Sequence, residues 1–403
     1  MLLAGTLAAI LPCAPATSQT LSSPVFNDQV NDGATFSDQV LDVVEASDST
    51  TAVTTATGNS AAFNVDTGDL DVRSNQTLQG DVRAETHVNV GVSAGQSAGF
   101  TTAATGNTAV GGVVSGTHTG IYTQHTGPVA IGALSHLEAP DAETGDIASS
   151  VQAIGNNQGL NASYGAAGVR VNQLNEATVA SDGGGNVGYV SGMSTFTATT
   201  AANNVAAAGV GSGQRLQINQ QNAAEVTQAS QFTAYGNAYQ STTQATASGN
   251  NISANEQGAL LDVTSNQQNV AYVRAQGENT GYQYGAGSAV AYGVGNSVSA
   301  GNIGPALVMD NTQVNEGGGV ESVASYSGNQ GYDASSSATA IGNAAAGFAC
   351  SDCEGSVKVS NRQRNSADVG ATATTSVGSA RSVNGVASAV GNSASYYVSR
   401  PSH

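Results

Sequence analysis

A two-residue alternation of inward-type and outward-type positions dominates this chain, and it is clearest in one recurring motif. The motif is Gln-x-Asn-x-Ala-x-Val, in which each named residue lies two positions from the next. Successive side chains of a β-strand point to opposite faces, so this spacing predicts a strand and not a helix. The clear copies pair Gln173 with Asn175, Gln220 with Asn222, Gln267 with Asn269, and Gln363 with Asn365.

The motif returns at a nearly fixed distance. Asn175, Asn222 and Asn269 follow one another at steps of 47 residues. A fixed period of this size is typical of a repeat array. The weaker copies are Gln29-x-Asn31, Gln313-x-Asn315 and two degenerate ones expected near Gln79 and Thr126.

Gly-Asn pairs form a second series with the same period. They are Gly58-Asn59, Gly106-Asn107, Gly155-Asn156, Gly249-Asn250, Gly295-Asn296, Gly342-Asn343 and Gly391-Asn392, and a degenerate Asn203-Asn204 fills the missing place. Gly and Asn both tolerate positive φ, so these pairs predict turns. Because the strand and turn series keep the same phase, the sequence predicts an all-β, elongated, repetitive β-solenoid of eight units of about 47 residues.

Composition narrows the kind of repeat. Only 9% of the residues are charged, there is no Trp, and 51 residues are Gly, whereas an ordinary soluble domain is about 25% charged. The chain therefore cannot build a core of large side chains, and a disordered chain is the alternative to a folded repeat. The phase-locked alternation favours a thin β-solenoid, in which stacked Asn and Gln side chains form hydrogen-bonded ladders.

The number of coils in each unit stays open at this point. Two coils per unit would give sixteen coils and a stack about 75 Å long, at roughly 4.8 Å per coil. Three shorter coils are the alternative, because extra Gly-Asn pairs at Gly236-Asn237 and Gly328-Asn329 subdivide some units.

The N-terminus has the features of an export signal. An apolar run from Leu2 to Leu11 precedes Ala14-Pro15-Ala16, which matches a signal-peptidase cleavage pattern. We therefore predict a signal peptide at 1–16, an N-terminal segment at 17–26, the solenoid at 27–398 and a tail at 399–403.

Charge and cysteine content fit an exported chain. The net charge is −18, which argues against nucleic acid and anionic lipid as partners. Cys350 and Cys353 form a Cys-x-x-Cys pair. In an oxidising exterior such a pair most simply closes a disulfide, with free or metal-bound thiols as the alternative.

Catalytic signals are weak. Gly91-x-Ser93-x-Gly95 and Gly183-x-Gly185-x-x-Gly188 lack the strand-to-helix setting that such motifs need. His118, His125 and His136 lie near three acidic residues, but their spacing matches no ligand pattern. We expect no enzyme activity, no cofactor and no metal.

Tyrosines recur at a similar period and leave two interpretations. Tyr189, Tyr239, Tyr284 and Tyr332 follow at steps of 50, 45 and 48 residues. If they stack along one face, they either form a platform for the apolar faces of sugars or pack against the solenoid; the second interpretation is favoured.

The Gln-x-Asn-x-Ala-x-Val units resemble curlin repeats, although the unit is about twice as long and lacks the curlin Gly between Gln and Asn. With its export signal and its acidic, Ala- and Gly-rich composition, the chain resembles the HfaD family of holdfast anchoring proteins. The resemblance implies an outer-membrane-associated surface protein that tethers the holdfast polysaccharide at the cell pole. It also implies two partners, the curli-like anchor subunit HfaA and the secretion lipoprotein HfaB. A curli-like or pilus-like matrix subunit, self-assembling through exposed end edges, is the alternative.

Overall fold

The computed structural model describes residues 22–350 and 355–399, and within them every regular element is a β-strand. No helix in these ranges is long and apolar enough to cross a membrane. The predicted signal peptide, most of the predicted tail, and Cys353 lie outside the described residues. The strands are β1 (Ser22–Asn31), β2 (Thr35–Ala46), β3 (Ser49–Leu78), β4 (Val82–Thr126), β5 (Ala130–Ser163), β6 (Ala166–Asn175), β7 (Thr178–Val210), β8 (Gly213–Asn222), β9 (Val226–Gln257), β10 (Leu260–Asn269), β11 (Tyr272–Asn302), β12 (Ala306–Asn315), β13 (Val320–Cys350), β14 (Ser356–Asn365), β15 (Val369–Ser379) and β16 (Ser382–Ser399).

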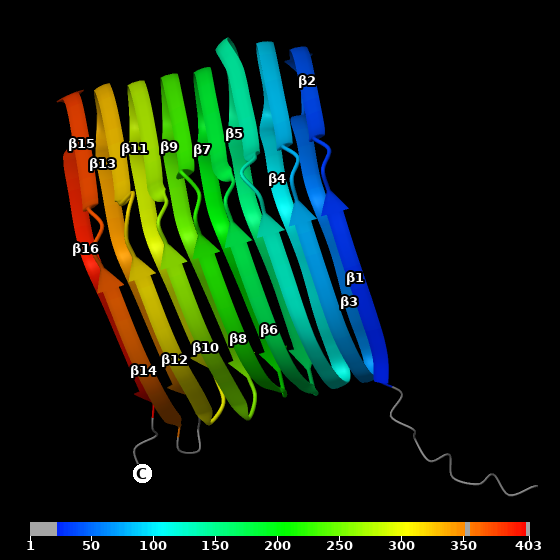
Figure 1. Cartoon of the computed structure of the whole chain (residues 1–403). Coiled ribbons are helices and arrows are strands. Elements are labelled where there is room, and N and C mark those ends of the chain that lie inside the picture. The colour runs from blue at the N-terminus through cyan, green and yellow to red at the C-terminus, as the bar shows by residue number, and fades with distance from the viewer. Residues whose placement is uncertain (1–21, 351–354, 400–403) are drawn as a thin grey trace, which may run out of the picture.

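All strand pairs are parallel, and each joins residues one repeat unit apart. Gln220, for example, lies opposite Gln173 on one side and Gln267 on the other. One unit of about 47 residues therefore makes one complete coil, and eight coils stack side by side (Figure 1). The all-β, repetitive β-solenoid is confirmed.

The expectation of two or three coils per unit is wrong. Each unit closes only once, because its longest strands bend and continue instead of ending at the extra Gly-Asn pairs. At roughly 4.8 Å per coil, eight coils give a stack about 35 Å high rather than 75 Å. The long dimension of the unit lies within the coil.

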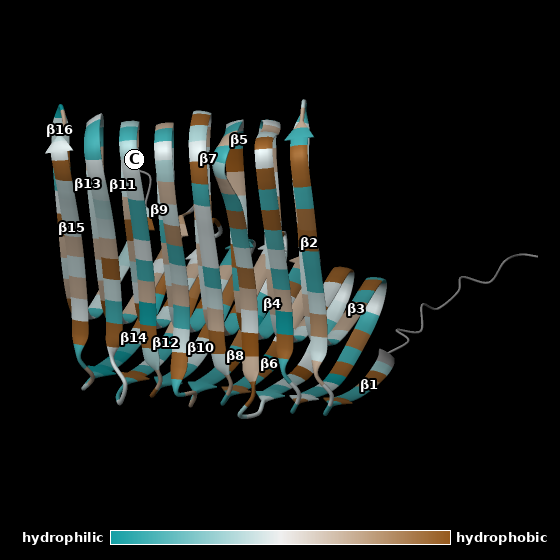
Figure 2. Cartoon of the chain, turned by 90° about the horizontal axis from the view of Figure 1, so that it is seen from above, coloured by the Kyte–Doolittle hydropathy of each residue, from teal (hydrophilic) through white to brown (hydrophobic). Residues whose placement is uncertain are grey.

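Each coil is a flattened loop with two facing layers. In one coil, the chain runs outward along β8 and the first part of β9, turns near 236–239, and returns along the rest of β9. Two contacts across the interior fix this course: Thr233 and Thr243 share a hydroxyl hydrogen bond, and Gln220 Nε2 donates to the Asn251 carbonyl at 3.0 Å. Figure 2 shows the two rows of strands meeting at an angle, with the short links between them along the corner.

The interior is thin and built mainly from small side chains. In the half of the coil that holds β8, Leu216 and Ile218 pack with Ile252 of the returning layer. In the other half, the buried cluster between the layers is mostly alanine, with Ala229 and Ala245 among its members. This is the core of small inward residues that the composition predicted.

The recurring motif faces this interior. Gln173, Asn175, Ala177 and Val179 are each no more than 3% exposed. The alternation thus continues inward across the short link between β6 and β7. The strand prediction is confirmed for Gln173 and Asn175 in β6 and for Val179 in β7, whereas Ala177 lies in the link between them. All four positions form part of the core.

The Gly-Asn pairs do not lie in turns. All seven are inside long strands, in β3, β4, β5, β9, β11, β13 and β16, and none of these glycines has a positive φ. At Gly249 the inward alternation shifts by one position, from Ala247 on one side to Asn250 on the other. The pair is therefore a bend within a continuous strand, and the expectation of left-handed turn conformations is wrong.

The degenerate pair that replaces Gly-Asn in one unit also lies one residue earlier than the expected Asn203-Asn204. Asn203 pairs with Asn156, so the residue at the glycine position is Ala202. A methyl group fits there, which shows that this position does not depend on the conformational freedom of glycine.

Candidate functional site

A ladder of glutamine side chains runs through the whole stack. From the second coil onward, each Nε2 donates to the Oε1 of the glutamine one coil nearer the N-terminus, at 2.7–2.9 Å. The eight members are Gln29, Gln76, Gln124, Gln173, Gln220, Gln267, Gln313 and Gln363. Each Nε2 also donates to a backbone carbonyl of the facing layer, as Gln267 does to Ser297 at 2.9 Å.

This ladder locates the two degenerate motif copies, which belong to the second and third coils. The second copy is Gln76-x-Leu78 rather than one near Gln79, and the third is Gln124-x-Thr126. Glutamine is therefore present in every coil, whereas the asparagine two residues further on is replaced by Leu78 in the second coil and by Thr126 in the third.

Asparagine forms two further ladders on the inward side of the strands. The longer one has eight members, joined by seven hydrogen bonds of 2.7–2.9 Å from each Nδ2 to the Oδ1 of the next member: Asn59, Asn107, Asn156, Asn203, Asn250, Asn296, Asn343 and Asn392. The shorter one joins Asn175, Asn222, Asn269, Asn315 and Asn365. Buried amides are costly without partners, so these ladders hold neighbouring coils in one register.

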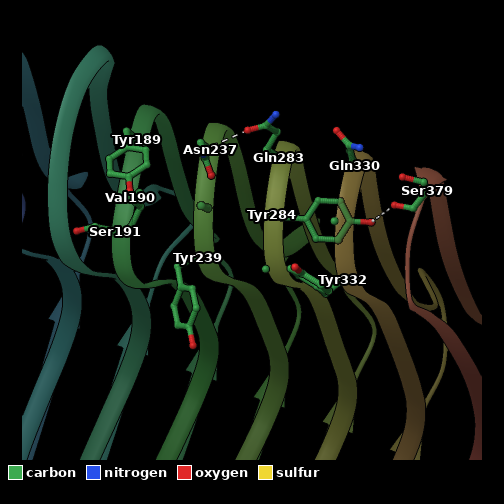
Figure 3. A pocket seen from close by; sticks show the side chains of 13 residues that line it. Tyr189, Val190, Ser191, Asn237, Tyr239, Gln283, Tyr284, Gln330, Tyr332 and Ser379 are labelled. Atoms are coloured by element: carbon green, nitrogen blue, oxygen red, sulfur yellow. Dashed lines mark hydrogen bonds between the residues drawn. The ribbon is translucent and has the colours of Figure 1, made fainter.

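A groove opens where the coils turn between their two layers. It has a volume of about 580 Å³ and crosses five coils, from Tyr189 to Ser379. Tyr239 and Tyr332 stand at its edge and are 67% and 63% exposed. Gly285 occupies the equivalent place in the coil between them, since its neighbours are in register with theirs. Figure 3 shows Tyr239 and Tyr332 on separate coils, with the wall of the groove above them.

Because residue 285 is glycine, no side chain stands between the two tyrosines. They are two coils apart, roughly 10 Å. Polar amides from Asn237, Gln283 and Gln330 form one row along the wall. Exposed aromatic faces beside amide donors and acceptors are the groups that bind sugar rings, because one sugar face is apolar and its rim carries hydroxyls.

The groove is held in place from behind and from its C-terminal side. Tyr284 is 4% exposed and packs edge-to-face on Tyr326, with ring centroids 5.3 Å apart. Burial, together with nearby Asp333, raises the pKa of Tyr284. The guanidinium of Arg381 lies 5.8 Å from the ring centroid of Tyr332 and pairs with Asp333, so it covers one side of that ring.

The four recurring tyrosines do not form one ladder. Tyr189 lies opposite Asn237, and Tyr284 lies opposite Ala238, so their columns differ from that of Tyr239. Tyr284 packs inward, while the other three face solvent. Their near-regular spacing reflects a shared turn, with offsets of one or two residues that change what each ring does.

The histidines do not come together. Their separate partners are Tyr122 for His118 (2.8 Å), Glu176 for His125 (2.9 Å) and Glu138 for His136 (2.6 Å). Burial lowers the pKa of His118 to about 4. Across residues 22–350 and 355–399, no group of three or more His, Cys, Asp or Glu side chains is placed to hold a metal ion.

The cysteine pair falls at an edge of the described chain. Cys350 ends β13, whereas Cys353 lies outside the described residues. The disulfide between them stays a prediction.

Comparison with known proteins gives one match. The model of the family described as holdfast attachment protein D (HfaD) matches residues 44–319. No curated protein and no solved structure matches the chain. The match covers more than half of the sequence and most of the coils described above. This family consists of structural proteins that act in holdfast attachment and is not a family of enzymes. Membership implies a cell-surface or extracellular role. The chain belongs to the holdfast attachment protein D family.

Proposed function

We propose that this chain is the tether between the holdfast polysaccharide and the outer membrane at the cell pole, and that the tyrosine groove is its polysaccharide contact. The family supports a role in holdfast attachment. The observation that carries the sugar contact is the pair of exposed rings, Tyr239 and Tyr332, flanking Gly285. Their separation of roughly 10 Å is close to that of alternate rings along an extended polysaccharide.

The solenoid suits a tether for mechanical reasons. A pull on the groove is shared among neighbouring coils through parallel backbone hydrogen bonds and the three amide ladders. Many bonds must then break together, so the resistance to shear exceeds that of any single contact. A curli-like companion of the HfaA type and a secretion lipoprotein of the HfaB type are the partners we propose for export and membrane attachment.

The alternative is a matrix subunit that polymerises without touching polysaccharide. It is favoured by the strand edges at both ends of the stack, which pair on one side only within the described residues. Deleting the gene separates the two functions. A tether predicts that adhesin is still made but is shed into the medium, whereas adhesin retained on the deleted cells contradicts the tether.

A narrower experiment tests the groove itself. We expect Tyr239→Ala with Tyr332→Ala to weaken binding of purified holdfast polysaccharide roughly tenfold or more, since two aromatic stacking contacts are lost. The matched control is Tyr164→Ala, because Tyr164 is 72% exposed but lies at the other turn of the coil. Isothermal titration or a pull-down with labelled polysaccharide measures the effect. Equal binding by the double variant and the control would show that the polysaccharide contacts another surface.

A further inference from the structure

The two ends of the stack carry opposite charge. The first coil, residues 22–68, has seven acidic and no basic residues, whereas the last coil, residues 356–399, has four basic and one acidic. The net charges are −7 and +3 in a chain of net charge −18. Figure 1 shows these coils at opposite ends of the stack, with β1 and β2 at one end and β14, β15 and β16 at the other.

Both ends present open strand edges. Within the described residues, β1 and β2 each pair on one side only, with β3 and β4, and β14, β15 and β16 likewise pair only with the coil before them. Unpaired N–H and C=O groups on such edges are ready to pair with another strand of the same direction. Pro24 lacks an N–H, which removes at most one of these bonds.

The amide ladders end in complementary groups. The Gln ladder donates toward the N-terminus, so Gln363 Oε1 at the C-terminal end has no donor within the described chain. The long Asn ladder donates the other way, so Asn59 Oδ1 at the N-terminal end accepts no hydrogen bond there, and Asn392 Nδ2 at the opposite end has no acceptor. Each end of the stack therefore carries a hydrogen-bonding group that is complementary to the unpaired group at the other end.

Continuing the internal register across the two ends brings matching residues together. The parallel pairing that places Asn31 and Asn365 at the same position of successive coils gives these pairs between copies: Asp28 opposite Arg362, Gln29 opposite Gln363, and Asn59 opposite Asn392. The exposed ring of Phe36 then lies opposite Gly370. A Cβ built on Gly370 would have no heavy atom within 4 Å.

We propose that a second copy of this chain is the partner of these ends. The last coil of one copy stacks in register on the first coil of the next, so that the backbone sheets and amide ladders run on across the joint. The contact is head-to-tail and uses two different surfaces, so it does not close on itself and builds a filament. This inference goes beyond the tether and does not depend on the groove.

The test is the assembly state of the purified exported chain. We expect the wild type to form a concentration-dependent series of species by sedimentation velocity, which shorten at high ionic strength because opposite charges attract across the joint. Arg362→Asp places a carboxylate opposite Asp28, and we expect it to raise the dissociation constant of the joint about tenfold or more. Asp28→Arg alone has the same effect.

The combined variant makes the test specific. Asp28→Arg with Arg362→Asp restores an opposite-charge pair at every joint, so assembly recovers only if the copies stack head-to-tail in this register. Arg170→Asp is the control, because Arg170 lies on the same side of the coil in the middle of the stack. Circular dichroism checks that each variant keeps its β-structure. A folded wild type that stays monomeric at all concentrations, or a combined variant that fails to recover, overturns the proposal.

Discussion

Individual buried amides join neighbouring coils of this fold. Asn250 donates to the Gln268 carbonyl and to Asn296 Oδ1, both at 2.8 Å, and accepts from Asn203 Nδ2. It is completely buried. Its neighbour Asn251 also belongs to a ladder, through Asn204, but it faces outward and is partly exposed.

Truncating these two neighbours should therefore have unequal effects. We expect Asn250→Ala to lower the free energy of unfolding by about 2–4 kcal/mol, because buried donors and acceptors on both sides lose their partner and water cannot replace it. Asn251→Ala should cost about 1 kcal/mol or less, since water can replace its bonds. Urea denaturation of both variants measures the difference, and equal losses would show that burial is not what gives the ladder its weight.

At the scale of the strand, the two layers lie so close that large inward rings need a glycine opposite. A Cβ built at Gly287 would lie 2.2–2.3 Å from atoms of the Tyr326 ring, and one built at Gly185 would lie 2.5 Å from Phe196. Tyr326 and Phe196 are both fully buried. The glycines of these strands therefore set where aromatic side chains enter a core that is otherwise mostly small. The Gly183-x-Gly185-x-x-Gly188 pattern reflects this packing, because Gly185 lies inside β7 against a ring.

We expect Gly287→Ala to lower the free energy of unfolding by about 1–3 kcal/mol through overpacking. Adding Tyr326→Leu should recover part of the loss, because the side chain that meets the new methyl group is shorter. Gly168→Ala in β6 is the control: its Cβ would meet no heavy atom within 4 Å, so it should change stability by about 0.5 kcal/mol or less. Thermal unfolding of the three variants tests this, and a double variant less stable than Gly287→Ala would contradict it.

At the scale of the whole molecule, each coil pairs its strands only with the coils next to it, so stability is close to a sum over coils and their interfaces. Leu216 and Val263 are paired positions of successive coils. Deleting residues 217–263 joins Leu216 to Thr264 and removes one unit without altering which side chains point inward.

We expect this 47-residue deletion, set by the pairing of Gln217 with Thr264, to fold into seven coils with a β-type circular dichroism spectrum and cooperative unfolding. Deleting residues 217–262 instead leaves one residue more, which turns Val263 outward and Thr264 inward and inverts the alternation beyond the junction. That variant should aggregate or stay unfolded. Similar behaviour of the two deletions would mean that register does not control folding of the stack.

The repeat period and the inward or outward direction of the strand side chains could be read from the sequence, because both follow from the spacing of residues along the chain. A side chain that faces the interior must be small or must join an amide ladder. Every second residue of Gln-x-Asn-x-Ala-x-Val meets this requirement. The inward direction of Gln, Asn, Ala and Val in the units that keep the full motif follows from it. The resemblance to the HfaD family also came from this pattern and from composition.

Closure of the coil was not local, and only the tertiary structure decided it. The hydrogen bonds that make one coil per unit join residues about 47 positions apart, and no short pattern says whether a strand bends at Gly-Asn or ends there. The same long-range register chose Gln76 over Gln79, aligned Asn203 with Asn156, and separated buried Tyr284 from exposed Tyr239 and Tyr332. The sequence by itself determined which residues recur and which face inward; which of them meet across the coils was decided by how each 47-residue unit closes on itself.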